Sequence, residues 1–318
     1  MDAFAHESVM VAEVIAALSP QSGGLYADAT AGGGGHSRAI LDASAPDGRV
    51  LAVDRDPTAV SAARTSLAPF ATRATVVHGE FAELPALLQE HGSLCVQGLV
   101  ADLGVSSPQL DQPERGFAFG SDGPLDMRMD PTRGASLREL IDESDERSLA
   151  DILFHYGEER RSRAIARSIL RARDEGELTG TASLRRAVLR ASGPRGKQRI
   201  DPATRSFQGL RIAINRELDQ LQALLAALPD LLDDGAVAAI ISFHSLEDRM
   251  VKHAFRGEPR LESLHKKPQL PSEEEQARNP RSRSAKLRAA RRLPRSEDGT
   301  TGPTGGDASW QREGRHAR

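Results

Sequence analysis

The first hundred residues alternate between short apolar runs and segments in which apolar residues recur at helical spacing. Short apolar runs predict buried strands, and the helical spacing predicts amphipathic helices. Strands that alternate with helices indicate an α/β fold with a parallel sheet covered on both faces. The strands are predicted at 24–30, 49–54, 74–78 and 96–101, and the helices at 36–43, 57–68 and 80–90.

This alternation stops after the fourth strand. Between 136 and 192 only helical spacing is found, which predicts a helical insertion. The polar end of the chain, at 296–318, has a composition typical of disorder. We therefore expect a discontinuous sheet domain, an inserted loop with a helical substrate domain, and a disordered tail. The sheet domain is placed at 1–105 and 216–295 and the insertion at 106–215, with a long helix at 202–228, a strand at 236–242, a helix at 244–255 and an edge strand at 284–292.

A long loop rich in Gly, Pro, Asp and Ser follows the fourth strand, at 102–130. So long a segment without an apolar period costs chain entropy and is favoured when the loop has a function. In open α/β sheets, ligands bind at the carboxyl ends of the strands, where Asp102, Ser106 and Ser107 would lie. These three residues are candidate site residues.

Charge is distributed unevenly along the chain. The net charge is −3, yet 160–216 holds 15 Lys or Arg against 4 Asp or Glu, and 276–295 holds 8 Lys or Arg and no acid. Such stretches predict a polyanionic partner, with solvated helix faces as the alternative. The single cysteine, Cys95, excludes a disulfide framework and a Cys-based zinc site, and no metal site is predicted. Neither a signal peptide nor an apolar membrane span is recognised, so we expect a cytoplasmic protein without a membrane partner.

A glycine turn with two nearby carboxylates predicts a cofactor site. Four glycines, at 32–35, follow the first predicted strand, and Asp54 ends the second strand 22 residues after Gly32. Glycines permit close approach of the backbone to a ligand, and a carboxylate in the position of Asp54 can bind ribose hydroxyls. The arrangement predicts a ligand that contains adenosine.

Two details favour S-adenosylmethionine over a dinucleotide. Ser37 stands where a dinucleotide motif would place its third glycine, and the carboxylate of Asp28 would repel a pyrophosphate but attract a cationic amino acid. Phe81, just past the third strand, would lie against the adenine. The alternative is an NAD-dependent oxidoreductase.

Taken with the loop, these motifs resemble those of a known family. The chain resembles the bacterial 16S rRNA (cytosine-N4) methyltransferases, which modify cytidine 1402 of the decoding centre. The family's N-terminal His-x-Pro-Val-Leu is altered here to His6-Glu-Ser-Val-Met10. The matching blocks are 34–37, 52–57, 102–109, 115–117, 122–130, 156–160, 211–218, 241–249 and 279–288, and they span about residues 6–290.

This resemblance implies a class I methyltransferase fold with an inserted helical substrate domain. It also implies S-adenosylmethionine as cofactor and 16S rRNA or the small ribosomal subunit as partner. The oligomeric state is left open between a monomer and a homodimer. The cofactor contacts that it implies are Gly34, Gly35, His36, Asp54, Phe81, Asp102 and Gln109.

Methyl transfer to cytosine N4 sets its own chemical requirements. The lone pair of N4 is delocalised into the ring, so oxygens that accept its two hydrogens would favour attack. The residues predicted to act on the acceptor are Asp102, Ser106, Ser107 and His244, with Asp102 assigned first to the amino-acid end of the cofactor. The base must leave its stack, so an extruded nucleotide is expected. A non-catalytic RNA-binding assembly factor with the same fold is the second alternative.

Overall fold

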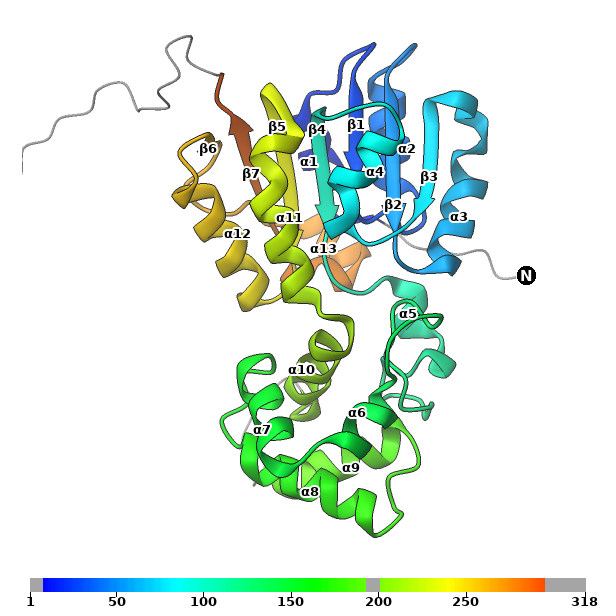
Figure 1. Cartoon of the computed structure of the whole chain (residues 1–318), viewed down its shortest axis with the longest axis vertical. Coiled ribbons are helices and arrows are strands. Elements are labelled where there is room, and N and C mark those ends of the chain that lie inside the picture. The colour runs from blue at the N-terminus through cyan, green and yellow to red at the C-terminus, as the bar shows by residue number, and fades with distance from the viewer. Residues whose placement is uncertain (1–7, 193–200, 295–318) are drawn as a thin grey trace, which may run out of the picture.

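The sheet and the helical insertion form two units, one beside the other (Figure 1). This computed structural model describes residues 8–192 and 201–294. The tail predicted at 296–318 and the first residues of the block that begins at His6 lie outside that part of the chain. The parallel strands of the sheet point their carboxyl ends toward the helical unit, which we define as residues 106–215 (Figure 1). Among the described residues, no helix is both long enough and apolar enough to cross a bilayer.

Within the described residues, seven strands form the sheet in the order β3-β2-β1-β4-β5-β7-β6. The strands from β3 to β5 are parallel, with Ala27 beside Leu51, and β7 runs antiparallel to β5, with Ala239 opposite Ala289. This mixed sheet with helices on both faces is a class I Rossmann-like arrangement, which confirms the predicted fold class. The strands are β1 (Leu25–Asp28), β2 (Arg49–Asp54), β3 (Ala74–His78), β4 (Val96–Asp102), β5 (Leu232–Ser242), β6 (Leu261–Ser263) and β7 (Lys286–Arg292).

The predicted strand at 284–292 is present as β7, but its position at the edge is wrong. It lies between β5 and β6, and its alanines pair with the alanines of β5. The edge strand is β6, which pairs with β7 through Leu261–Ser263. Three residues are too few to show a period in the sequence, so β6 could not be predicted from its pattern.

Side chains alternate between the two faces of the sheet, and each face has its own helices. Ala27 and Leu51 pack with α4, α11 and α12, whereas Tyr26 and Val50 pack with α1, α2 and α3. This explains the nearly continuous apolar runs in the sequence, because the central strands are buried on both faces. The helices are α1 (Val11–Leu18), α2 (Gly35–Ala43), α3 (Pro57–Leu67), α4 (Leu84–Glu90), α11 (Glu217–Leu231), α12 (Ser245–Gly257) and α13 (Glu273–Arg278), with 3-10 turns η1 (Ala68–Arg73), η2 (Phe81–Glu83) and η4 (Pro280–Ser284).

The helical unit packs around a separate cluster of apolar side chains, which includes Leu149, Ile165 and Leu210. Phe117, Leu125 and the two loop methionines join this cluster, so the 102–130 loop is anchored by its own apolar residues. We therefore propose to keep the division at 106–215. Its elements are α5 (Ser107–Asp111), η3 (Pro113–Arg115), α6 (Leu137–Glu143), α7 (Glu146–His155), α8 (Ser162–Asp174), α9 (Thr181–Ala191) and α10 (Ala203–Asn215).

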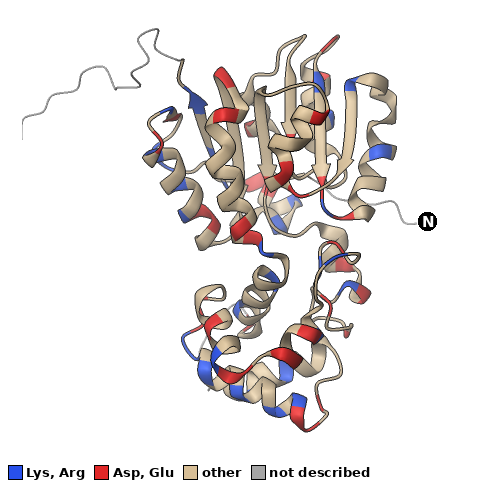
Figure 2. Ribbon diagram, in the orientation of Figure 1, with Lys and Arg blue, Asp and Glu red and all other residues tan. Residues whose placement is uncertain are grey.

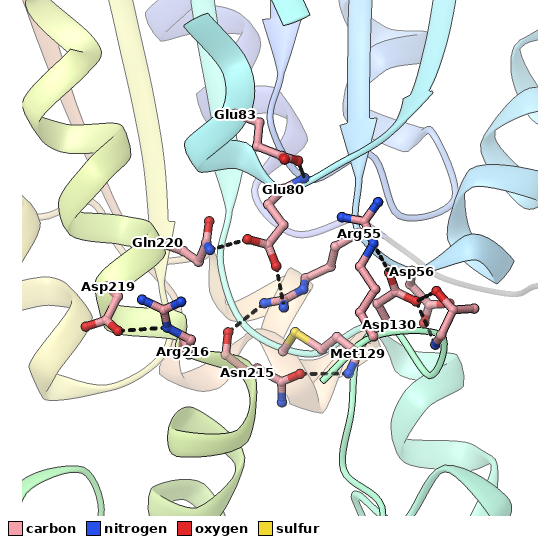
Figure 3. A network of polar contacts seen from close by, with 12 residues as sticks. Arg55, Asp56, Glu80, Glu83, Met129, Asp130, Asn215, Arg216, Asp219 and Gln220 are labelled. Atoms are coloured by element: carbon pink, nitrogen blue, oxygen red, sulfur yellow. Dashed lines mark hydrogen bonds and ion pairs between the residues drawn. The ribbon is translucent and has the colours of Figure 1, made fainter. Parts of the chain in front are cut away.

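The single helix predicted at 202–228 is wrong, because the chain breaks between α10 and α11. Arg216 adopts a left-handed conformation, with φ of 49°. The buried side chain of Asn215 donates to the carbonyl of Met127 at 2.8 Å and accepts from the N–H of Met129 at 2.7 Å. Arg55 of the sheet unit donates to the Asn215 carbonyl at 2.7 Å (Figure 3). These contacts outweigh the helical propensity of the segment and fix the junction of the two units.

Candidate functional site

A pocket lies at the carboxyl ends of the strands, on the side that faces the helical unit. Its floor is formed by the ends of β2 and β4, and the 102–130 loop and α11 close its sides. Six of the predicted site residues line it, namely Asp54, Phe81, Asp102, Ser106, Ser107 and Gln109. The topology therefore brings together residues that are as far apart as 55 positions in the sequence.

Asp54 is held at the end of β2 by the glycine turn. Its two carboxylate oxygens accept from the N–H groups of Gly32 and Asp56, each at 2.8 Å. Burial raises the pKa of Asp54 to about 6. Each oxygen keeps a second lone pair, so the carboxylate can also accept from the hydroxyls of a ribose. The geometry fits the adenosine half of S-adenosylmethionine.

Asp102 ends β4 with a carboxylate oxygen that lacks a partner. Its N–H donates to Thr30 Oγ1 at 2.6 Å, while its buried Oδ1 has no hydrogen-bond partner within the described residues. Burial, together with the charges of nearby carboxylates such as Asp28, raises the pKa of Asp102 to about 7. A buried acceptor without a partner is costly, and an ammonium group would satisfy it. The amino-acid end of S-adenosylmethionine supplies such a group.

Asp28 does not line the pocket, which corrects the expectation that it attracts the cofactor. It is fully buried and accepts from Ser37 Oγ at 2.7 Å and from the N–H of Thr30 at 3.2 Å. Ser37, which stands in place of a glycine, is thus the partner of Asp28. The carboxylate of Asp28 shapes the turn, and Asp102 rather than Asp28 faces the pocket.

Gly34, Gly35 and His36 also lie outside the pocket lining. Two of them support the N-terminal segment: His36 Nε2 is 2.9 Å from the carbonyl oxygen of Val9, and a Cβ on Gly35 would lie 2.1 Å from Ser8 Oγ. Val9 itself lines the pocket. Direct cofactor contacts of all three residues stay a prediction, and the geometry gives Gly35 and His36 a role in holding Ser8 and Val9.

The 102–130 loop is tied to the turn after β2 by Asp56. This buried carboxylate accepts from Gln109 Nε2 and from Arg115 Nη1, each at 2.8 Å. Gln109 Oε1 accepts from the N–H of Ser106 at 3.0 Å, so the same side chain also orders the start of α5. Arg115 donates further to the Met129 carbonyl at 2.9 Å. The loop is therefore held in place before any ligand binds.

His244 lies beside the pocket and does not line it. It caps α12, where its Nδ1 accepts from the N–H of Glu247 at 3.4 Å and its Nε2 lies 3.1 Å from Glu247 Oε1. Glu247 lines the pocket in its place, together with Phe243 and Glu217. Both glutamates fall in sequence blocks that match the family, at 211–218 and 241–249, but neither block alone shows which side chain faces the pocket.

Glu217, His244 and Glu247 offer ligand atoms within 4.8 Å of one another, a spacing that a metal ion could use. However, Arg211 binds both oxygens of Glu217 at 2.7 Å. The guanidinium already neutralises this carboxylate, so the cluster is balanced by the chain's own charges.

Comparisons with known proteins identify the family of the chain. The model of the MraW methylase family matches residues 3–293. The chain is 54% identical over 292 residues to ribosomal RNA small subunit methyltransferase H of Sorangium cellulosum, with 92% of each chain covered. It is 51% identical over 290 residues to the protein of that name from a Cyanothece strain, with 91% of this chain and 95% of the relative covered. A solved structure of Aeropyrum pernix fibrillarin with bound S-adenosyl-L-methionine is 12% identical, with a TM-score of 0.40 and coverage of 87% and 74%. The chain belongs to the MraW methylase family.

Proposed function

We propose that the protein transfers the methyl group of S-adenosylmethionine to N4 of cytidine 1402 in 16S rRNA. Membership in a methylase family supports the reaction class, and relatives named as rRNA small subunit methyltransferases support the substrate. The observation that carries the proposal is the unpartnered Oδ1 of Asp102, because a cationic amino-acid ligand satisfies it and a pyrophosphate does not. This argues against the NAD-dependent oxidoreductase.

Some residues of the pocket would bind the cofactor, and others would bind the acceptor base. S-adenosylmethionine supplies an already activated methyl group on a sulfonium, so the chain need only hold the acceptor nitrogen in line with it. Asp54 would hold the ribose and Asp102 the ammonium group. Phe81, half-buried in the wall, offers a face to the adenine.

The acceptor end is formed by Ser106 and Ser107, with Glu247 and Phe243 in the same lining. Serine and carboxylate oxygens that accept the two hydrogens of N4 would localise its lone pair toward the methyl group. Transfer leaves a cationic nitrogen, which loses its proton after the reaction. No strong base is required beforehand, which agrees with the position of His244 outside the lining.

Calorimetry and product analysis together test the proposal. S-adenosylmethionine is expected to bind the purified protein, and NAD is not. With a deuterated methyl donor and small ribosomal subunits, digestion and mass spectrometry should place the label on one cytidine. Cofactor binding without any labelled nucleotide would favour the assembly factor, and binding of NAD alone would favour the oxidoreductase.

A further inference from the structure

The helical unit carries a second concave surface, separate from the cofactor pocket. This groove lies between the turn that joins α7 to α8, the start of α10 and the first residue of α12. Arg160, Arg161 and Arg205 line it, and Ser245 closes its end. The turn belongs to the block at 156–160, to which the pocket chemistry assigns no role.

In the part of 160–216 that the structure describes, seven of twelve arginines are neutralised by neighbouring carboxylates. Arginine and acid residues are interspersed over the helical unit (Figure 2). Ion pairs hold Arg167, Arg171, Arg173, Arg185, Arg190, Arg211 and Arg216. The positive charge of the sequence is therefore a poor guide to where a polyanion binds, because exposed pairs present little net field.

The arginines of the groove differ from these, as do the exposed Arg163 and Arg186, which do not line the groove. Within residues 8–192 and 201–294, no carboxylate lies within ion-pair distance of the guanidinium groups of Arg160, Arg161 and Arg205, all of which are exposed. The groove also holds three carboxylates: Glu158 is bound by Arg249 and Asp201 by Arg185, whereas Glu159 accepts from the backbone N–H of Arg161 at 3.0 Å. Because Glu158 and Asp201 are already neutralised, the three arginines outnumber the remaining carboxylate and leave the groove with a net positive charge.

Close packing fixes these arginines on one surface. A Cβ on Gly157 would lie 2.6 Å from the Arg205 carbonyl oxygen, and a Cβ on Gly209 would lie 2.7 Å from the Gly157 nitrogen. Only glycine permits such an approach of the turn to α10. Contact between the two backbones brings Arg160 and Arg161 beside Arg205.

The turn is also attached to the sheet unit next to the pocket. Glu158 adopts a left-handed conformation, with φ of 50°, and its carboxylate accepts from Ser245 Oγ and from Arg249 Nη2 of α12. Ser245 lines the groove, whereas Phe243 and Glu247 line the pocket. The groove and the pocket are thus separated by the first turn of α12.

An exposed aromatic residue stands just before the turn. Phe154 is 54% exposed, and its ring contacts that of His155 edge-on at 5.1 Å between centroids. Aromatic faces beside basic side chains are typical of surfaces that bind single-stranded RNA, because bases stack on the rings while cations meet the phosphates.

We propose that this groove binds the phosphate backbone of the rRNA strand next to the methylated nucleotide, through Arg160, Arg161 and Arg205. Phe154, which precedes the turn that lines the groove and lies outside the lining itself, stacks on a base of the same strand. The inference rests on the proposed function, since it concerns the RNA from which the target base is extruded. It assigns RNA binding to three particular arginines and to one face of the helical unit.

The test compares two triple variants with the same change of charge. Arg160→Gln/Arg161→Gln/Arg205→Gln removes the unpaired arginines, and Arg167→Gln/Arg171→Gln/Arg190→Gln removes exposed arginines that are paired. The probe is an RNA fragment with the decoding-centre sequence, titrated at several salt concentrations. The groove variant should bind at least about tenfold more weakly and lose up to about 2 units of the slope of log K against log salt, since each single-strand phosphate contact contributes about 0.7.

The paired variant should keep the slope of the unmodified protein, and both variants should keep its affinity for S-adenosylmethionine. If the triple variant has a lower Tm, the RNA titration is repeated with the single variants Arg160→Gln and Arg205→Gln. Phe154→Ala should weaken RNA binding by about tenfold with an unchanged slope, because stacking involves no counterion release. Equal losses in the two triple variants, or none in either, would overturn the proposal.

Methylation by the unmodified protein separates this proposal from the proposed function. If the unmodified protein methylates the cytidine and the groove variant binds RNA normally, the groove proposal is wrong and the proposed function stands. If the unmodified protein methylates no nucleotide but the groove variant loses RNA affinity, the proposed reaction is wrong and the groove is still an RNA-binding site.

Discussion

The pocket and the groove leave charges of opposite sign without partners. Among the described residues, a buried oxygen of Asp102 in the pocket has no donor, whereas the exposed guanidinium groups of Arg160, Arg161 and Arg205 in the groove have no carboxylate within ion-pair distance. The proposed cofactor is cationic and the proposed substrate is polyanionic, so each region presents the charge that its ligand lacks. Under these two proposals, unpaired charges locate function in this chain better than the total charge of a stretch does.

Removing the carboxylate of Asp54, which we propose binds the ribose, should have the largest effect on the pocket. Asp54→Ala is expected to weaken S-adenosylmethionine binding by about 100-fold or more, because buried polar groups of a ligand would be left without partners. RNA affinity should stay unchanged, since the groove lies in the other unit. Calorimetry with the cofactor and an RNA titration measure both values, and equal cofactor affinity in the variant would mean that Asp54 does not hold the ribose.

Neutralising Asp102 should raise the thermal stability of the ligand-free protein and lower its affinity for S-adenosylmethionine. Burial raises its pKa to about 7 from an ordinary value of 3.8, so the stability that this carboxyl contributes is present below pH 3.8 and is lost as the pH rises through 7. Asp102→Asn should therefore raise the Tm of the ligand-free protein at pH 8 by about 2 °C or more, with little gain at pH 4.

The same variant should bind S-adenosylmethionine at least about tenfold more weakly, because the ammonium group loses its counter-charge. In the unmodified protein the affinity should fall as the pH drops from 8 to 5, since Asp102 and then Asp54, whose pKa is about 6, take up protons. Thermal unfolding and calorimetry at several pH values check both statements. A pH-independent affinity would show that these carboxylates do not meet the cofactor.

The sequence predicts the parts of the fold and of the site that depend on neighbouring residues, and it misses those that depend on contacts between distant segments. The strands from 24–30 to 96–101 and the helical insertion followed from hydrophobic period, and Asp54 and Asp102 followed from their positions at strand ends. Glu217 and Glu247 were missed because their placement depends on how α11 and α12 pack. The break at Arg216 was missed because contacts of Asn215 with Met127 and Met129, far away in the sequence, cause it.

The junction between the two regions offers a test of their connection. Asn215→Ala leaves the Met129 N–H and the Met127 carbonyl without their partner, at a cost of about 2 kcal/mol in the free energy of unfolding. Denaturant unfolding measures this loss. Cofactor affinity should change less than the rate of methyl transfer, because the variant loosens the position of one unit against the other (Figure 3).

A smaller effect on cofactor binding is expected when the contacts of Arg115, which hold the 102–130 loop, are weakened. Arg115→Lys keeps a positive charge but cannot donate to Asp56 and to the Met129 carbonyl at once. We expect a fewfold rise in KM for the cofactor, since Gln109 shares Asp56 with Arg115. Steady-state kinetics checks this, and an unchanged KM would mean that the loop keeps its position without the bidentate arginine.

Mass mapping of the methylated nucleotide tests the central claim most directly. Small ribosomal subunits that lack the modification would be incubated with the purified protein and a deuterated methyl donor, then digested and sequenced by mass spectrometry. The account predicts one labelled methyl group, on N4 of cytidine 1402, and none with Asp54→Ala. A label on another atom or nucleotide, or no label with a protein that binds the cofactor, would contradict it.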